Sequence, residues 1–189
     1  MPNKYVDFVT DEHFEKCVKH VCDAYANFFA DINKDDLQKN GVDPFKMTFD
    51  MRKIDGSFDS WLIREKLRQD DKTAGMAIGQ FHQMLLGGVD GWKDLTTGDG
   101  THLDLQKEDN TVWMELKNKE NTVNSSSMHK MRERLEDVNE DHPNCKCYWA
   151  FVVASNGKSY DKIWWPYANA KAKNENIRRW LEYFAGQSR

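Results

Sequence analysis

Residues 101–127 read THLDLQKEDNTVWMELKNKENTVNSSS and carry the strongest structural and chemical signals in the chain. Between residues 111 and 117, valine, methionine and leucine occupy every second position, which predicts a β-strand. The positions between them include Glu115 and Lys117. Both charged side chains therefore lie on one face of the predicted strand.

A second strand is predicted just before the first. Residues 102–106 alternate between polar and apolar side chains, and residues 107–110 are typical of a hairpin turn. If all of residues 107–110 form the loop, Asp104 faces Trp113, and Glu115 is its diagonal neighbour at roughly 7 Å between backbones. A tighter turn places Asp104 and Glu115 directly opposite each other, at about 5 Å. Either register lets both carboxylates reach one cation.

Two carboxylates that share a strand pair repel each other unless a cation lies between them. We expect Mg2+, which binds through oxygen ligands, at Asp104 and Glu115. A bound metal lowers the pKa of its water molecule and polarises a phosphate. The ammonium of Lys117 can then hold the attacking water or stabilise the charge that builds on the phosphate. The three residues predict phosphodiester hydrolysis.

The order Asp104, ten residues, Glu115-X-Lys117 resembles the PD-(D/E)XK nuclease superfamily, with Leu103 where that motif has proline. By itself this motif is weakly specific, because an acid followed by E-X-K is common by chance in a charged chain. The longer run over residues 115–127 resembles the ELKNK-x-NT-x-NSSS signature of type II restriction endonucleases that cut GGNCC or GGWCC sites. The resemblance extends to residues 43–47, 78–83, 91–92, 98–100 and 177–179.

This resemblance implies an α/β fold with a restriction-endonuclease-like mixed β-sheet core flanked by helices and with additional N-terminal helices. It implies Mg2+-dependent hydrolysis of double-stranded DNA at a short palindrome, leaving 5′-phosphate ends. A palindromic target implies a homodimer, with two active sites related by a twofold axis. It also implies a cognate DNA methyltransferase that protects the host.

Several polar residues are candidates for supporting roles at this site. In many nucleases of the superfamily, a helix at the place of residues 73–86 contributes an acidic residue to the metal site. Here we expect Gln83 to orient water or to touch DNA. That Gln83 is an ordinary surface amide is an equally good alternative. Amide, hydroxyl and lysine side chains can bind base edges and phosphates. The candidates for such DNA contacts are Asn118, Lys119, Asn121, Thr122, Asn124, Ser125 and Ser126. Asn124 and Ser125 can equally cap a helix, whose N-terminus itself attracts phosphate.

The length of 189 residues is typical of one domain, so we expect a single domain over residues 1–189. The formal charge of −4 is unusual for a DNA-binding protein. The distribution of charge matters more: residues 1–115 hold 14 basic against 22 acidic side chains, whereas residues 116–189 hold 13 against 9. The basic surplus begins at the proposed site.

Neither a signal peptide nor an apolar run of about 18 residues is present, so we expect a cytoplasmic protein. The four cysteines lack a CxxC zinc spacing, and we expect them to be reduced and mostly packed.

The other elements are predicted from apolar periodicity and from capping or breaking residues. We expect helices from Thr10 or Asp11 to Phe28, from Phe58 after a Ser57 cap, over residues 73–86, from Asn124 or Ser125 to before Pro143, and over residues 176–184. Residues 88–100 are expected to form an ordered, glycine-rich loop that approaches DNA or the metal site. Residues 147–154 predict a buried, parallel strand, and Asn156-Gly157 predicts a tight hairpin into residues 160–165. The aromatic run at residues 164–167 either packs in the core or stacks on bases.

Two other functions fit the same residues. One is a PD-(D/E)XK nuclease of repair or structure-specific type. The other is an inactive DNA-binding relative, an alternative that Gln80 and the short C-terminal part keep open. Metal-dependent digestion of plasmid DNA distinguishes all three.

Overall fold

The computed structural model describes residues 3–26, 28, 41–53, 56–95, 100–121, 123–155, 157–164 and, as backbone only, 177–181. The described elements are α1 (Asp11–Ala26), α3 (Pro44–Lys53), α4 (Phe58–Gly87), β1 (Trp92–Asp94), β2 (Leu105–Lys107), β3 (Val112–Lys119), α5 (Ser125–Asp141), β4 (Lys146–Val153), β5 (Tyr160–Ile163) and β6 (Ile177–Leu181). None of the described helices has the length and hydropathy needed to cross a membrane. The expected α/β class, a mixed sheet with flanking helices and additional N-terminal helices, is confirmed.

Contacts within the chain define two compact units. The first consists of residues 1–17 and 79–189 and contains the sheet, and the second consists of residues 18–78 and contains α3 and most of α4. The expectation of one domain over the whole chain stays a prediction.

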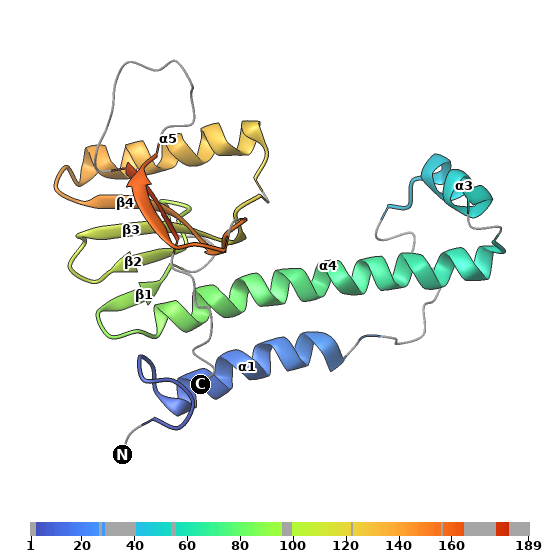
Figure 1. Ribbon diagram of the computed structural model, residues 1–189, viewed down its shortest axis with the longest axis horizontal. Coiled ribbons are helices and arrows are strands. Elements are labelled where there is room, and N and C mark those ends of the chain that lie inside the picture. Colours follow the sequence, from blue (N-terminus) through green and yellow to red (C-terminus); the bar gives the residue numbers. More distant parts are fainter. Residues whose placement is uncertain are drawn as a thin grey trace. The chain divides into compact units, whose positions relative to one another are not determined.

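The sheet of the first unit has the strand order β1-β2-β3-β4-β6-β5 (Figure 1). β2 runs antiparallel to both of its neighbours, β1 and β3, whereas β4 runs parallel to both of its neighbours, β3 and β6. β5 closes the order as an antiparallel neighbour of β6. The predicted passage from β3 through α5 to a parallel β4 is confirmed.

The alternation in β3 divides the apolar core between the two faces of the sheet. Trp113 joins the cluster that contains Leu135 of α5 together with Trp149. Met114 and Leu116 join a second cluster, against which Leu86 from the end of α4 packs. Both faces are covered, and Glu115 and Lys117 follow Trp113 on the α5 side.

Three helix starts were predicted correctly from capping residues. The hydroxyl of Thr10 accepts from the His13 N–H at 3.2 Å, and that of Ser57 accepts from the Ser60 N–H at 3.3 Å. The side chain of Asn124 caps α5 by accepting from the Ser127 N–H at 2.9 Å.

The end of the sheet differs from the prediction. Residues 177–181 form strand β6 and not the helix expected over residues 176–184, and β6 lies between β4 and β5. The expected tight hairpin from β4 into β5 is therefore wrong, because β5 pairs with β6. Asn156 and residues 165–167 lie outside the described residues; Trp164 packs in the core, at 4% exposure.

Two further predictions are corrected. The helices expected from Phe58 and over residues 73–86 are one 30-residue helix, α4, because the polar residues between them are all compatible with a helix. Residues 88–100, expected as a loop, contain strand β1, which pairs with β2. Three ladder positions support this strand, so the glycines flank it and do not prevent it.

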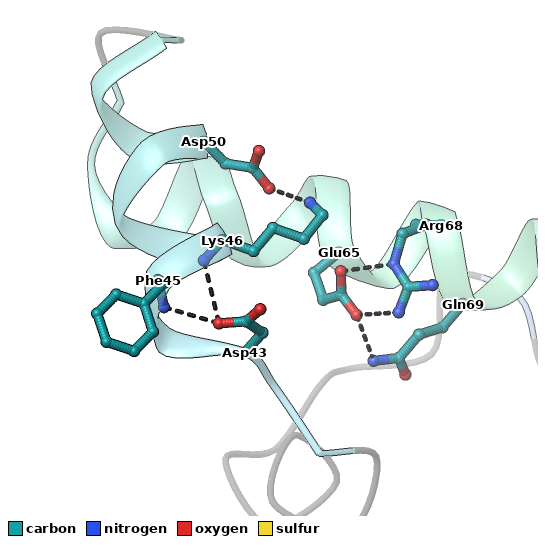
Figure 2. Close-up of polar contacts among 7 residues, drawn as sticks. All are labelled: Asp43, Phe45, Lys46, Asp50, Glu65, Arg68 and Gln69. Carbon is teal, nitrogen blue, oxygen red and sulfur yellow. Dashed lines mark hydrogen bonds and ion pairs between the residues drawn. The ribbon is translucent and has the colours of Figure 1, made fainter.

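Figure 2 shows how polar contacts organise α3 and α4 in the second unit. The carboxylate of Asp43 caps α3 by accepting from the N–H groups of Phe45 and Lys46 at 2.9 and 3.2 Å. On α4, Glu65 accepts from Arg68 and from the amide of Gln69. Each group is paired within its own helix or cap.

Candidate active site

The β2–β3 hairpin has the tighter of the two registers considered. Leu105 pairs with Met114, so the same register sets Asp104 opposite Glu115. The turn closes through a 2.9 Å bond from the Asn110 N–H to the Lys107 carbonyl, with Asn110 in the left-handed region at φ 60°. Asparagine adopts that conformation more readily than most residues. The turn thus brings the two carboxylates to adjacent backbone positions.

The ammonium of Lys117 lies close to both carboxylates of this pair. The ammonium of Lys117 lies 2.5 Å from Oε1 of Glu115 and 3.7 Å from Oδ2 of Asp104. Oδ2 of Asp104 also accepts from the Leu116 N–H at 2.7 Å. The structure therefore brings together the acid, acid and lysine of the sequence motif, each held by the strand pair.

Burial shapes the electrostatics of the carboxylate pair. The Asp104 side chain is 23% exposed and the Glu115 side chain 7%. Burial, and next the repulsion from Glu115, raise the pKa of Asp104 to about 6, although Lys117 and the Leu116 N–H act in the opposite direction. The raised pKa of Asp104 means that a ligand with positive charge would favour the ionised form of this side chain.

One oxygen of the pair is left unsatisfied. Oε2 of Glu115 is buried and has no hydrogen-bond partner among the described residues. Such an acceptor is costly unless a donor or a cation meets it. No group of three or more histidine, cysteine or acidic side chains suited to a metal occurs in the described part of the chain. Two carboxylates still fit Mg2+, because that ion typically takes one or two carboxylates and completes its shell with water and substrate phosphate.

Gln83 donates hydrogen bonds to β1 and to the residue that precedes β2. Its amide nitrogen donates to Oδ1 of Asp94 in β1 at 2.7 Å and to the backbone carbonyl of Asp104 at 3.3 Å. These bonds connect the end of α4 to the residue that carries the first carboxylate. Gln83 is therefore not an ordinary surface amide, and its role in catalysis stays a prediction.

The predicted DNA-contact residues occupy the end of β3 and the start of α5. Asn118 is half-buried, and the exposed residues are Lys119, Asn121, Asn124, Ser125 and Ser126. Thr122 lies outside the described residues. The side chain of Asn124 is engaged as the helix cap, where it also accepts from the Ser126 hydroxyl at 2.9 Å. The capping alternative is thus observed for Asn124, and DNA contact by this set remains a prediction.

A cavity lined by Glu115 and Lys117, but not by Asp104, contains residues that the sequence analysis did not single out. Its volume is about 400 Å³, and Glu115 and Lys117 form one wall. The rest of the lining is Val123, Ser127, Lys130, Met131 and Arg134. Positions 127, 130, 131 and 134 form one helical stripe. The helical spacing of these positions was the signal in the sequence that could have grouped Lys130 and Arg134 on one face. The sequence alone does not show that Arg132, which lies between them, is on a different face.

Comparisons with known proteins find similar sequences over most of the chain. The family model described as Eco47II restriction endonuclease matches residues 6–183. The chain is 34% identical over 164 residues to the type II restriction enzyme Sau96I of Staphylococcus aureus, covering 87% of this chain and 61% of that relative. It is 35% identical over 115 residues to the type II restriction enzyme Eco47II of Escherichia coli, covering 60% of this chain and 47% of that relative. The chain thus spans about three fifths and about half of these two relatives.

Proposed function

Because the chain belongs to the Eco47II restriction endonuclease family, we propose that it is a type II site-specific deoxyribonuclease with its active site at Asp104, Glu115 and Lys117. The observation that carries this proposal is the convergence of the Lys117 ammonium on the carboxylates of Asp104 and Glu115. An acid pair next to a cationic donor is suited to phosphodiester hydrolysis.

In the proposed mechanism each residue has a distinct task. Asp104 and Glu115 hold a divalent cation, for which we propose Mg2+, through the carboxylate oxygens that include the unsatisfied Oε2 of Glu115. When bound, that ion supplies an acidified water and a polarised phosphate. Lys117 aligns the water and stabilises the charge that develops on the phosphate oxygens during in-line attack. Hydrolysis leaves a 5′-phosphate and a 3′-hydroxyl.

Gln83 acts in this proposal as a positioning residue. Its bond to the Asp104 carbonyl holds the backbone that carries the first carboxylate, and its bond to Asp94 ties that backbone to β1. Fixing a ligand's backbone keeps the carboxylate oriented for the cation.

The remaining details of the proposal follow from the signature at residues 115–127. The target is a short palindrome in double-stranded DNA, GGNCC or GGWCC, and a homodimer presents one active site to each strand. Asn118, Lys119, Asn121, Thr122, Asn124, Ser125 and Ser126 provide the DNA-contacting surface at the end of β3 and the start of α5. A cognate methyltransferase protects the same sites in the host.

Digestion of plasmid DNA in Mg2+ tests this function. We expect discrete fragments whose sequenced ends share one GGNCC or GGWCC site, and no cleavage in EDTA. A smear or cleavage restricted to junctions supports a repair-type nuclease instead. Asp104→Ala and Lys117→Ala should each abolish cutting while the circular dichroism of the folded protein is retained; wild-type cutting by either variant removes that residue from the mechanism.

A further inference from the structure

We infer that the cavity between β3 and α5 is a binding site for a backbone phosphate of the DNA strand, held by Lys130 and Arg134 beside the residues proposed for catalysis. The inference rests on the proposed function and extends it to two residues outside the nuclease motif. The 400 Å³ cavity has Glu115 and Lys117 on the strand side and the two cations on the helix side.

The two cations are available for a ligand. Lys130 is exposed and Arg134 is half-buried, and within the described part of the chain neither makes a hydrogen bond or an ion pair. Arg132, between them in sequence, differs: it is 1% exposed, pairs with Glu136 at 2.7 Å and donates to the Trp164 carbonyl at 2.8 Å. The fold uses Arg132 to hold the core and leaves Lys130 and Arg134 facing the cavity.

The charge balance of the lining selects an anion. In the lining, Lys117, Lys130 and Arg134 provide three positive charges against the carboxylate of Glu115. Asp104, whose Oδ2 lies 3.7 Å from the Lys117 ammonium, adds a second carboxylate beside the cavity, so a surplus of positive charge remains. Such a local excess is notable in a chain with a formal charge of −4. Unpaired lysine and arginine side chains bind phosphate oxygens readily, and arginine can do so with two parallel bonds.

The position of the cations points to the substrate strand as the source of this anion. Lys130 and Arg134 are four residues apart on one helix, so their backbones are separated by about 6 Å along its axis. They line the same cavity as Glu115 and Lys117, two of the three residues proposed for catalysis. The N-terminus of α5 does not account for the site, because the Ser127 N–H is already bonded to Asn124. A neighbouring phosphate of the same strand is therefore the ligand.

Metal-free DNA binding tests the inference without depending on catalysis. Fluorescence anisotropy with a short labelled duplex in EDTA at low salt, where non-specific binding is strong, should show a 3- to 10-fold weaker affinity, to order of magnitude, for Lys130→Ala and for Arg134→Ala. Each variant should also reduce the slope of log affinity against log salt by about 1, equally for duplexes with and without the target. Lys130→Arg and Arg134→Lys should restore affinity.

Lys146→Ala is the matched control. Lys146 is an exposed cation that pairs with Val112, at the opposite end of β3 from Lys117, and it should bind DNA as the wild type does. Alanine variants at residues 130 and 134 with wild-type affinity and salt slope would overturn the inference and leave the nuclease proposal intact; a cavity that takes only free phosphate gives this result. Absence of duplex binding by the wild type overturns both.

Discussion

Glu65 and Glu115 are buried to a similar extent, at 8% and 5% exposure, and each has a cationic partner, Arg68 or Lys117, yet the rest of their surroundings differs. Both oxygens of Glu65 are satisfied on its own helix, because Arg68 donates to each of them and Gln69 adds a 3.0 Å bond (Figure 2). These partners, first of all the hydrogen bond from Arg68, lower the pKa of Glu65. Glu115 faces a second acid and keeps one oxygen without a partner among the described residues.

The contrast separates a structural charge from a functional one. A carboxylate whose partners lie one turn away on its helix is complete in the free protein. Glu115 faces Asp104, raises the pKa of that neighbour, and leaves its own Oε2 without a partner among the described residues, so it can still accept a cation or a donor. Burial alone does not distinguish the two glutamates; the state of their hydrogen-bond partners does.

The largest expected effect concerns cleavage by the two glutamate variants. Glu115→Gln should reduce the rate of Mg2+-dependent DNA cleavage by about 10²- to 10³-fold or more, because it removes a charged cation ligand. Glu65→Gln should cleave within about twofold of wild type while its free energy of unfolding falls by about 1.5–3 kcal/mol, the range for hydrogen bonds to charged groups. Initial rates on plasmid DNA and urea unfolding measure both. Equal losses of cleavage in the two variants would abolish the distinction.

The next effect is the response of stability to pH. Because the pKa of Asp104 is raised, the ionised side chain opposes folding above about pH 6, and this penalty disappears below the ordinary value near 3.8. Asp104→Asn should therefore stabilise the metal-free protein at pH 8 by on the order of 2 kcal/mol, with the gain vanishing near pH 4. Glu65 has the opposite sign: its lowered pKa contributes stability above 4.5 that is lost as the pH falls through its folded value.

Unfolding by urea in EDTA at pH 8 and pH 4 measures the Asp104→Asn and Glu65→Gln variants side by side. A destabilised Asp104→Asn protein at pH 8 would show that the acid pair is not strained in the absence of metal.

The smallest effect distinguishes two glutamine side chains. Gln83 donates to the Asp104 carbonyl and to Asp94, whereas Gln69 donates to Glu65. Gln83→Met should lower the cleavage rate by about 10-fold, as expected for a residue that orients a metal ligand, and should raise the Mg2+ concentration needed for half-maximal rate. Gln69→Met should change stability only. An unchanged Mg2+ requirement in Gln83→Met would exclude a positioning role.

The local part of this site was readable from the sequence. Residues 112–117 alternate with a period of two, and in a strand this period decides which face each side chain occupies. The sequence therefore predicted that Glu115 and Lys117 share a face, and in the structure that face is the one toward α5. The register across the hairpin was left between two alternatives, because both fit the same polar turn. The left-handed Asn110 distinguishes them, and that conformation is set only when the strands pair.

The long-range part was not readable. Ile177, Trp180 and Leu181 fit a helical period, but pairing with β4 makes residues 177–181 a strand, and a five-residue run is too short to separate the two periods. In α5, the sequence presents Lys130, Arg132 and Arg134 as three similar cations. Only packing against the sheet buries Arg132 and leaves the others at the cavity.

The place of β6 between β4 and β5 has a consequence for biosynthesis. β5 precedes β6 in the chain but joins the sheet only through it, so the edge of β4 stays open until residues 177–181 leave the ribosome. Pairings between distant segments form slowly, and an open apolar edge invites association between nascent chains. A chain in which residues 177–181 have not yet paired with β4 is therefore the state most prone to association.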